Sequence, residues 1–312
     1  MNAPFTPGLH ADISAEDYHD LPALSAGGAW MLVEECPQKM WFNSPLNPAY
    51  APTRERKFDV STAAHCAMLE PDEFERRTVI IDAADYRTKD AKAKRDEAYD
   101  GGKTPLLVEQ LDQVKAIRAA ILAHPLAAKA FTTGKPEQTL LWRDPETQIP
   151  CKARPDWLRD GGAYIADLKA QHTANPRDWP RTAFGLGYHL RAAWYLDGCE
   201  IVTGKRPEHY WFVVVEREPP HCISVFQLDE RAIEWGRLFA RRAIQILAKC
   251  IERDECPGYR DPQHPDRDRA FTVSIPTFGE YQLHERHEAG EFKSEKIPKD
   301  LLERARLMQA PL

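Results

Sequence analysis

Two short motifs of the chain carry residue types that could do metal chemistry. Arg154-Pro155-Asp156 is followed, after ten intervening residues, by Asp167-Leu168-Lys169. In a strand the side chains of residues i and i+2 leave the same face, so Asp167 and Lys169 should point the same way. Two carboxylates and a lysine that converge at a strand end suit a hard divalent cation such as Mg²⁺ with an activated water.

The setting of the second motif argues against a simple surface ion pair. An Asp-x-Lys sequence on a strand is more often a solvent-exposed ion pair than a functional site. Its neighbours Tyr164, Ile165 and Leu168 are apolar, however, and predict a largely buried strand. A buried acid and lysine are costly unless they have a role. The turn sequence 160–162 (DGG) is typical of a hairpin, which would bring the two motifs side by side.

The elements that must position these motifs form a mixed pattern. Apolar patterning and turn residues predict strands at 138–143, 149–158, 163–170, 209–216 and 222–228. They predict helices beginning at Ser14 and Ser25 and covering 58–70, 107–121, 176–196 and 229–253, the last two separated by strands. The first three strands should form an antiparallel meander. Strands 163–170 and 209–216 flank a helix, so they could lie parallel in one sheet, and the fold class is mixed α/β.

Composition excludes several classes of protein. The chain has 312 residues, 42 Lys and Arg against 48 Asp and Glu, and a net charge of −6, which excludes a polybasic nucleic-acid binder but not an enzyme with a local basic groove. No apolar run approaches the roughly 18 residues of a membrane span, and no signal peptide is apparent. The seven cysteines include no CxxC pair, which favours a reducing cytoplasm over disulfides or a zinc ribbon.

The motifs and the blocks around them resemble a known family. CKARPDW and ADLKA resemble the core of the PDDEXK nuclease superfamily, and the chain as a whole is similar to its exodeoxyribonuclease VIII (RecE-type) members, which occur in phages and prophages. The similar blocks run in order from residue 12 to about 260: ISAEDYHDLPALSAGGAWMLVEECPQKMWF, STAAHCAMLEPDEF, RTKDAKAKRDEA, PEQTLLWRD and YHLRAAWYLDG.

The resemblance implies a restriction-endonuclease-like core, in which helices flank a central mixed sheet. It implies a nuclease domain over 1–260, with a helical part at about 12–130 and a catalytic core at about 131–260. After Pro257 the sequence is polar and interrupted by prolines, which predicts an extended or partly ordered polar tail at 261–312. The implied activity is a Mg²⁺-dependent 5′→3′ exonuclease, with Mn²⁺ able to substitute, which acts on ends of linear double-stranded DNA and leaves 3′ single strands for recombination. The implied partners are DNA, a single-strand annealing recombination protein and further copies of the chain in a ring, in the cytoplasm of a bacterial host and without a membrane.

Carried over by position, the resemblance also assigns site residues. It makes His65, Asp156 and Asp167 metal ligands together with the Leu168 carbonyl, Lys169 the catalytic lysine and Glu137 a further acidic group. The residues expected to contact DNA are Tyr188, Arg191, Tyr195, Arg154, Arg87 and Lys89. Tyr188 and Tyr195 lie two helical turns apart and share a face. The basic run 87–95 fits a solvated helix face equally well.

Two positions depart from the family pattern. Ser61 stands where the family has Gly, and Arg191 stands where it has Gln. Arg191 could bind a phosphate through two hydrogen bonds. The alternative functions are therefore a DNA-binding or scaffold protein that keeps the fold without catalysis, and an endonuclease or nicking enzyme of the same fold.

Overall fold

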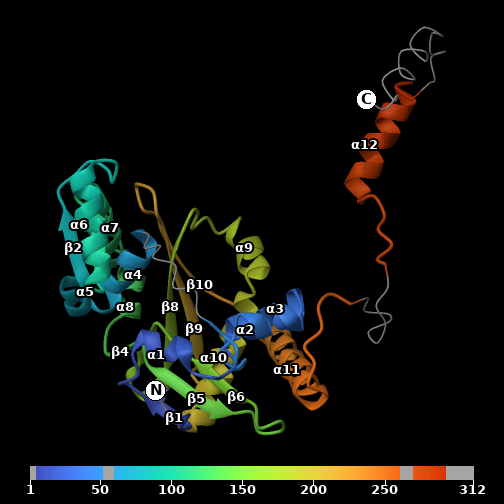
Figure 1. The fold of residues 1–312 in the computed structure, drawn as a ribbon, viewed down its shortest axis with the longest axis horizontal. Helices are drawn as coiled ribbons and strands as arrows, with labels where there is room; N and C mark the ends of the chain where they lie inside the picture. The colour runs from blue at the N-terminus through green and yellow to red at the C-terminus, as the bar shows by residue number, and fades with distance from the viewer. Residues whose placement is uncertain (1–4, 52–59, 261–269, 293–312) are drawn as a thin grey trace, which may run out of the picture. The chain divides into compact units, whose positions relative to one another are not determined.

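The computed structural model describes residues 5–51, 60–260 and 270–292. The chain divides into two compact units, Met1–Tyr259 and Arg260–Leu312. No helix in these described ranges has both the length and the apolar character needed to cross a membrane. The motifs of interest all lie in the first unit, where strands and helices are mixed along the chain (Figure 1).

The first unit is built on a five-stranded sheet in the order β10-β9-β8-β7-β4. The strands are β4 (Gly134–Pro136), β7 (Trp157–Arg159), β8 (Tyr164–Gln171), β9 (His209–Glu216) and β10 (Ile223–Gln227). β8 and β9 are parallel, as the sequence suggests, and Asp167 lies opposite Phe212 in their register. The other pairs are antiparallel, so the sheet is mixed.

A second, three-stranded sheet has the order β1-β5-β6, with β1 (Gly8–His10), β5 (Thr139–Arg143) and β6 (Pro150–Ala153). The prediction of one continuous strand over 149–158 is wrong, because the chain leaves β6 of this sheet and enters β7 of the larger one. The break falls at Arg154-Pro155-Asp156. Pro155 has no N–H to donate to a strand ladder, which favours a break at this point. Asp156 is thereby placed at the junction of the two sheets.

Helices cover both faces of the larger sheet (Figure 1). On one face α4 (Val60–Leu69), α7 (Val108–Ala123) and α8 (Pro125–Ala130) pack against Ala166 and Leu168. On the other face α2 (Ala26–Glu34), α10 (Tyr188–Thr203) and α11 (Glu230–Arg253) pack against Ile165 and Phe212. Successive residues of β8 therefore serve opposite layers, and a polar residue on this strand points into a packed layer rather than into solvent.

Smaller elements complete the unit. α1 (Ala15–Asp20) and α2 begin at the predicted caps, where the hydroxyls of Ser14 and Ser25 accept hydrogen bonds from the backbone N–H groups of Asp17 and Gly28. α3 (Pro37–Phe42) follows α2. α5 (Pro71–Arg77), α6 (Lys89–Asp100) and a parallel pair, β2 (Thr78–Ile81) with β3 (Thr104–Leu107), form a helical lobe with α4 and α7.

The predicted helix 176–196 is two helices. α9 (Trp179–Gly185) and α10 are separated at Gly187, where φ is 68° and an added Cβ would lie 2.4 Å from the ring of Trp30. The predicted end at Gly198 is also wrong, because this glycine lies inside α10 and leaves room for Trp142, whose ring would be 2.7 Å from a Cβ there. α10 ends instead at Gly204, whose φ is 71°.

In the second unit the described residues contain one helix, α12 (Thr277–Glu288). The polar sequence after residue 260 predicts an extended or partly ordered tail and gives no sign of this helix. Pro276 and Gly279 are residues that usually interrupt helices, so the apolar pattern does not predict a helix here. Proline is nevertheless well tolerated next to a first helical turn.

Candidate metal centre

Asp156 lies at the centre of a polar cluster between the two sheets. Its Oδ2 accepts a hydrogen bond from the backbone N–H of Leu168 at 2.8 Å and lies 2.9 Å from Nε2 of His65. The ammonium of Lys169 is 4.0 Å from the same oxygen. Burial raises the pKa of Asp156, but the charges of His65 and Lys169 and these hydrogen bonds outweigh it and hold the pKa well below its usual value. Asp156 is thus held as a carboxylate.

His65 and Glu137 bring two further ligand types to Asp156. His65 comes from α4, and its Nδ1 lies 3.9 Å from Oε1 of Glu137. Glu137 follows β4 with a φ of 51°, and its backbone N–H donates to the Asp156 carbonyl at 3.2 Å. One ligand atom from each of the three residues lies within 4.8 Å of the others. Burial and the charge of Asp156 raise the pKa of Glu137.

Asp167 and Lys169 leave the same face of β8, as the strand period predicts. Asp167 is almost fully buried; its Oδ2 accepts a hydrogen bond from the hydroxyl of Tyr210 at 2.7 Å, and its Oδ1 contacts the ammonium of Lys169. That ammonium lies 3.4 Å from the Leu168 carbonyl. Burial, helped by the charge of Arg191, lowers the pKa of Lys169 to about 8 against the opposing charges of Asp156 and Glu137. Lys169 therefore joins the two acidic residues.

This donor set fits a divalent cation. Carboxylate oxygens are the ligands of Mg²⁺ and Mn²⁺, and an imidazole nitrogen is accepted by Mn²⁺ and later transition metals. The compact group consists of His65, Glu137 and Asp156, and the Asp167 carboxylate contacts Tyr210 and Lys169 instead. The resemblance predicts Asp167 as a metal ligand and Glu137 as a further acidic group near the metal. In this geometry it is Glu137 that shares the compact group with His65 and Asp156.

The two predicted tyrosines of α10 lie beside this cluster but are buried. The Tyr188 hydroxyl accepts a hydrogen bond from Nε2 of Gln171 at 2.8 Å, and Tyr195 packs edge-on against Tyr210 with ring centroids 6.0 Å apart. The guanidinium of Arg191 and the ammonium of Lys169 each lie 5.9 Å from the ring centroid of Tyr188. Arg191 forms no ion pair with a carboxylate among the described residues.

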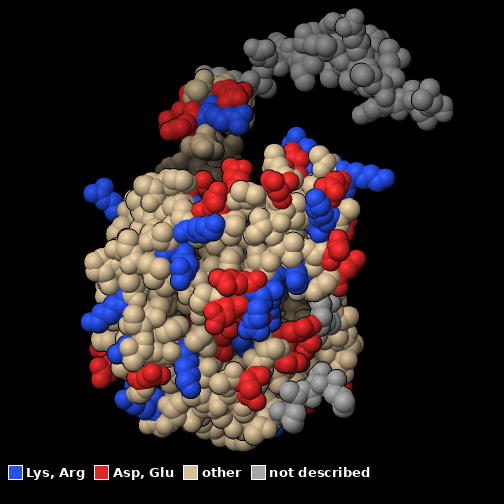
Figure 2. All heavy atoms as spheres, turned by 90° about the vertical axis from the view of Figure 1, so that its left-hand side faces the viewer, with Lys and Arg blue, Asp and Glu red and all other residues tan. Residues whose placement is uncertain are grey.

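The other predicted DNA contacts are of two kinds. Arg154 is engaged inside the protein: its Nε donates to Glu137 Oε2 at 2.6 Å and its Nη1 to the Ile13 carbonyl at 2.8 Å. Arg87 and Lys89 are exposed at the start of α6, and Arg87 lies 3.4 Å from Asp85. Figure 2 faces this lobe and shows Lys and Arg interspersed with Asp and Glu. A DNA role for these three residues stays a prediction.

Two residues of the site, Tyr210 and Gln171, lie outside the motifs from which the site was predicted. Tyr210 holds Asp167 across the parallel pair β8–β9, and Gln171 continues the alternation of Asp167 and Lys169 and reaches Tyr188. Gln171 could have been found by extending the period-two pattern by one step. Tyr210 has no signal of its own, because its approach to Asp167 depends on the register of two strands that are distant in sequence.

Comparisons with known proteins agree with this architecture. A family model described as "PDDEXK-like domain of unknown function (DUF3799)" matches residues 32–262. A crystal structure of a "putative exonuclease" from Eubacterium rectale is similar with a TM-score of 0.57 and 12% identity, over 85% of this chain and 97% of that chain. The structure of SSO0001 aligns with a TM-score of 0.26 and 12% identity over 67% of this chain and 84% of that one, too weakly to support any argument. No curated protein matched the sequence.

Proposed function

Because the chain belongs to the PDDEXK-like family whose model spans residues 32–262, we propose that it is a metal-dependent nuclease. Membership of the family, together with the likeness to the Eubacterium rectale structure, confirms the predicted mixed α/β PDDEXK-like fold. Neither the family description nor that structure assigns an activity to this chain, so the activity is argued from the site.

One observation carries the proposal. Asp156, which directly precedes β7, and Asp167 on the neighbouring strand β8 both lie near the Lys169 ammonium, and His65 and Glu137 converge on Asp156 from two other parts of the chain. Asp167 is buried, and Asp156, Glu137 and His65 are partly exposed. Three carboxylates and an imidazole gathered this closely are costly for a protein that uses them only as structure. A divalent cation would offset that cost, since it offers positive charge to all of these groups.

The chain's own residues have distinct parts in this mechanism. His65, Glu137 and Asp156, with Asp167, would hold the cation, which supplies charge to the scissile phosphate and a more acidic bound water. The Lys169 ammonium can donate hydrogen bonds to a phosphate oxygen or to the attacking water. The Leu168 N–H orients Asp156, Tyr210 orients Asp167, and Arg154 orients Glu137.

The finer proposal is a 5′→3′ exonuclease on linear double-stranded DNA that uses Mg²⁺, with Mn²⁺ as a substitute. Its support is the resemblance of the ordered sequence blocks to exodeoxyribonuclease VIII. The same resemblance supports a role in producing 3′ single strands for recombination, a ring of several copies and an annealing protein as partner.

End-labelled substrates test the finer proposal. Linear duplex labelled at the 5′ end should release labelled mononucleotide at once with Mg²⁺, whereas 3′-labelled duplex should release its label only after extensive digestion. Closed circular duplex should remain intact. Early release of the 3′ label would contradict the polarity, and nicking of the circle would favour the endonuclease alternative.

The alternative of a non-catalytic DNA-binding protein rests on Ser61 and Arg191, the two departures from the family pattern. It predicts binding of duplex DNA with no release of nucleotides at any concentration of Mg²⁺ or Mn²⁺. The residues nearest the proposed chemistry are all present in the cluster, which favours the enzyme.

A further inference from the structure

A large cavity opens next to the candidate metal centre. It has a volume of about 810 Å³ and is bounded by α1, the start of α2, the end of α3, β6 and α10. Arg191 and Tyr195 of α10 line it, and the Tyr188 ring has both Arg191 and Lys169 at 5.9 Å from its centroid. The cavity thus shares Arg191 with the surroundings of the cluster, and its volume is in the range of small-molecule sites.

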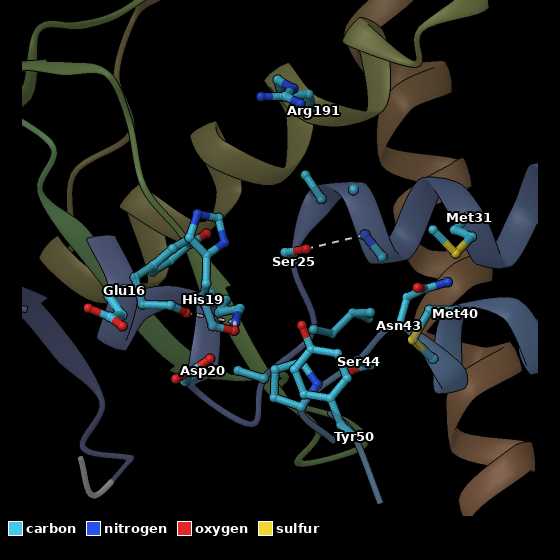
Figure 3. Close-up of a pocket in the computed structure, with 18 of the residues that line it drawn as sticks. Glu16, His19, Asp20, Ser25, Met31, Met40, Asn43, Ser44, Tyr50 and Arg191 are labelled. Carbon is cyan, nitrogen blue, oxygen red and sulfur yellow. Dashed lines mark hydrogen bonds between the residues drawn. The ribbon is translucent and has the colours of Figure 1, made fainter. Parts of the chain in front are cut away.

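Arg191 supplies this cavity with a guanidinium that feels the charge of Asp156 but makes no ion pair with a carboxylate in the part of the chain that the structure describes. Its neighbour is the ring of Tyr188. A guanidinium in such a position can bind a phosphate through two parallel hydrogen bonds. In Figure 3 Arg191 lies at the top of the view, whereas Glu16 and Asp20 lie at the lower left, so an anion at Arg191 avoids these two carboxylates.

The remaining walls suit a flat, mostly apolar group. Tyr50 lines the cavity as a partly exposed ring, together with the thioethers of Met31 and Met40, and the buried Tyr18 and Tyr195 complete the wall. Aromatic faces bind nucleobases by stacking, and they do so with little dependence on the base. Figure 3 shows Asn43 and Ser44 on the same side as Tyr50, where they can hydrogen-bond to base edges.

Small residues at the start of α2 keep the cavity open. Ala26, Gly27 and Gly28 form this wall, and an added Cβ at Gly27 would meet only the Ser25 hydroxyl, at 3.9 Å. The backbone N–H groups of the first helical turn have no acceptor within the helix, and that of Gly28 donates to the Ser25 side chain. A larger side chain at Gly27 would thus project into space that a ligand could fill, without disturbing the helix.

We propose that this cavity binds a nucleoside monophosphate unit at the end of the substrate strand, with its phosphate on Arg191 and its base against the ring of Tyr50. The inference rests on the proposed nuclease function and adds a subsite to it. Arg191 delivers the neighbouring phosphodiester toward Lys169 and Asp156, and a cavity for one nucleotide favours cleavage at strand ends over cleavage within a strand.

Direct binding in EDTA tests the cavity without catalysis. Isothermal titration would compare thymidine 5′-monophosphate, thymidine 3′-monophosphate, thymidine and inorganic phosphate. At least one nucleotide should bind about tenfold more tightly than thymidine and than phosphate. Arg191→Met should remove this preference over thymidine, whereas Arg242→Met, which removes an exposed charge of α11 outside the cavity, should not. The preferred nucleotide reports which strand end the cavity takes.

A size series at Gly27 provides the matched control. Gly27→Ala should bind the nucleotide like the parent, and Gly27→Leu should bind at least about tenfold more weakly with an unchanged circular dichroism spectrum. Equal binding by the parent and Gly27→Leu, or binding of phosphate as tight as that of the nucleotides, would overturn the inference. If the parent is a metal-dependent nuclease and Gly27→Leu binds the nucleotide and cleaves DNA as the parent does, the nucleotide-binding cavity is refuted and the nuclease function is not. A chain that binds the nucleotide but cleaves no DNA refutes the proposed function alone.

Discussion

The hydroxyl of Tyr210 offers a sharp test of the site, because one atom can be removed from beneath Asp167 without changing the shape of the core. It donates to Asp167 Oδ2 at 2.7 Å, and the Asp167 side chain is only 2% exposed, so water cannot readily take its place. In Tyr210→Phe the ring keeps its packing against Tyr195 and Phe212.

The magnitude follows from the kind of hydrogen bond that is lost. A hydrogen bond to a buried charged group is worth about 1.5–3 kcal/mol, and groups that orient metal ligands typically contribute about 10–100-fold in affinity or activity. We therefore expect Tyr210→Phe to lower kcat/KM for nucleotide release from linear duplex by about 10–100-fold. Initial rates over a range of Mn²⁺ concentrations, with thermal unfolding measured in parallel, provide the assay.

Tyr164→Phe is the matched control. It deletes the same atom from the same sheet, where the Tyr164 hydroxyl donates to the Lys129 carbonyl at 3.1 Å. It should cost about 1 kcal/mol of stability and leave kcat/KM within about twofold of the parent. Full activity of Tyr210→Phe, or equal losses in both variants, would refute the reasoning that Tyr210 acts by orienting Asp167.

Three further predictions concern metal, pH and backbone. Mn²⁺ at about 100 times its Kd should stabilise the protein by about 2.7 kcal/mol in thermal unfolding, and Asp156→Asn should abolish the shift; an equal shift in both would place the metal elsewhere. Burial raises the pKa of Asp144, but hydrogen bonds from Arg241 and Thr147 outweigh this effect and hold the pKa below its ordinary value. The ionised Asp144 should therefore stabilise the folded protein at pH values above the ordinary pKa of an aspartate, and this stabilisation should be lost as the pH falls through the lowered pKa. Urea unfolding of Asp144→Asn should lack this acid-side loss, and an identical pH profile in the two proteins would contradict it. Gly187→Ala should lower the free energy of unfolding, measured in urea, by about 1–3 kcal/mol, because φ at this position is positive and the Trp30 ring fills the space of a Cβ. An unchanged free energy of unfolding would contradict this close packing.

Local signals account for much of the fold. Ser14 and Ser25 cap the helices that the sequence predicts, and the alternation around Asp167 and Lys169 correctly indicates a buried strand whose two polar side chains share a face. The two-residue period of a strand puts Asp167 and Lys169 on one face of β8 because β8 is a regular strand over its whole length. These features depend only on residues close together in the chain.

The errors arise where tertiary contacts decide. Gly187 and Gly198 must be glycines because the rings of Trp30 and Trp142 lie against them, and these rings come from distant parts of the sequence that no local pattern predicts. The passage of the chain from one sheet to the other at Pro155 likewise depends on which strands are available as partners. Within the site, the nearness of Glu137 to His65 is set by the junction of the two sheets, which no local pattern encodes.

The most direct test of the central claim is metal-dependent hydrolysis of DNA by the site as assigned. Acid-soluble nucleotide release from uniformly labelled linear duplex would be measured for the parent, Asp156→Asn and Lys169→Met, each with Mn²⁺ and with EDTA. The account predicts release by the parent with Mn²⁺, none with EDTA, and a loss of at least about 100-fold in both variants while their folds persist. Release that is equal in all of these conditions, or absent from the parent at every metal concentration, would contradict it.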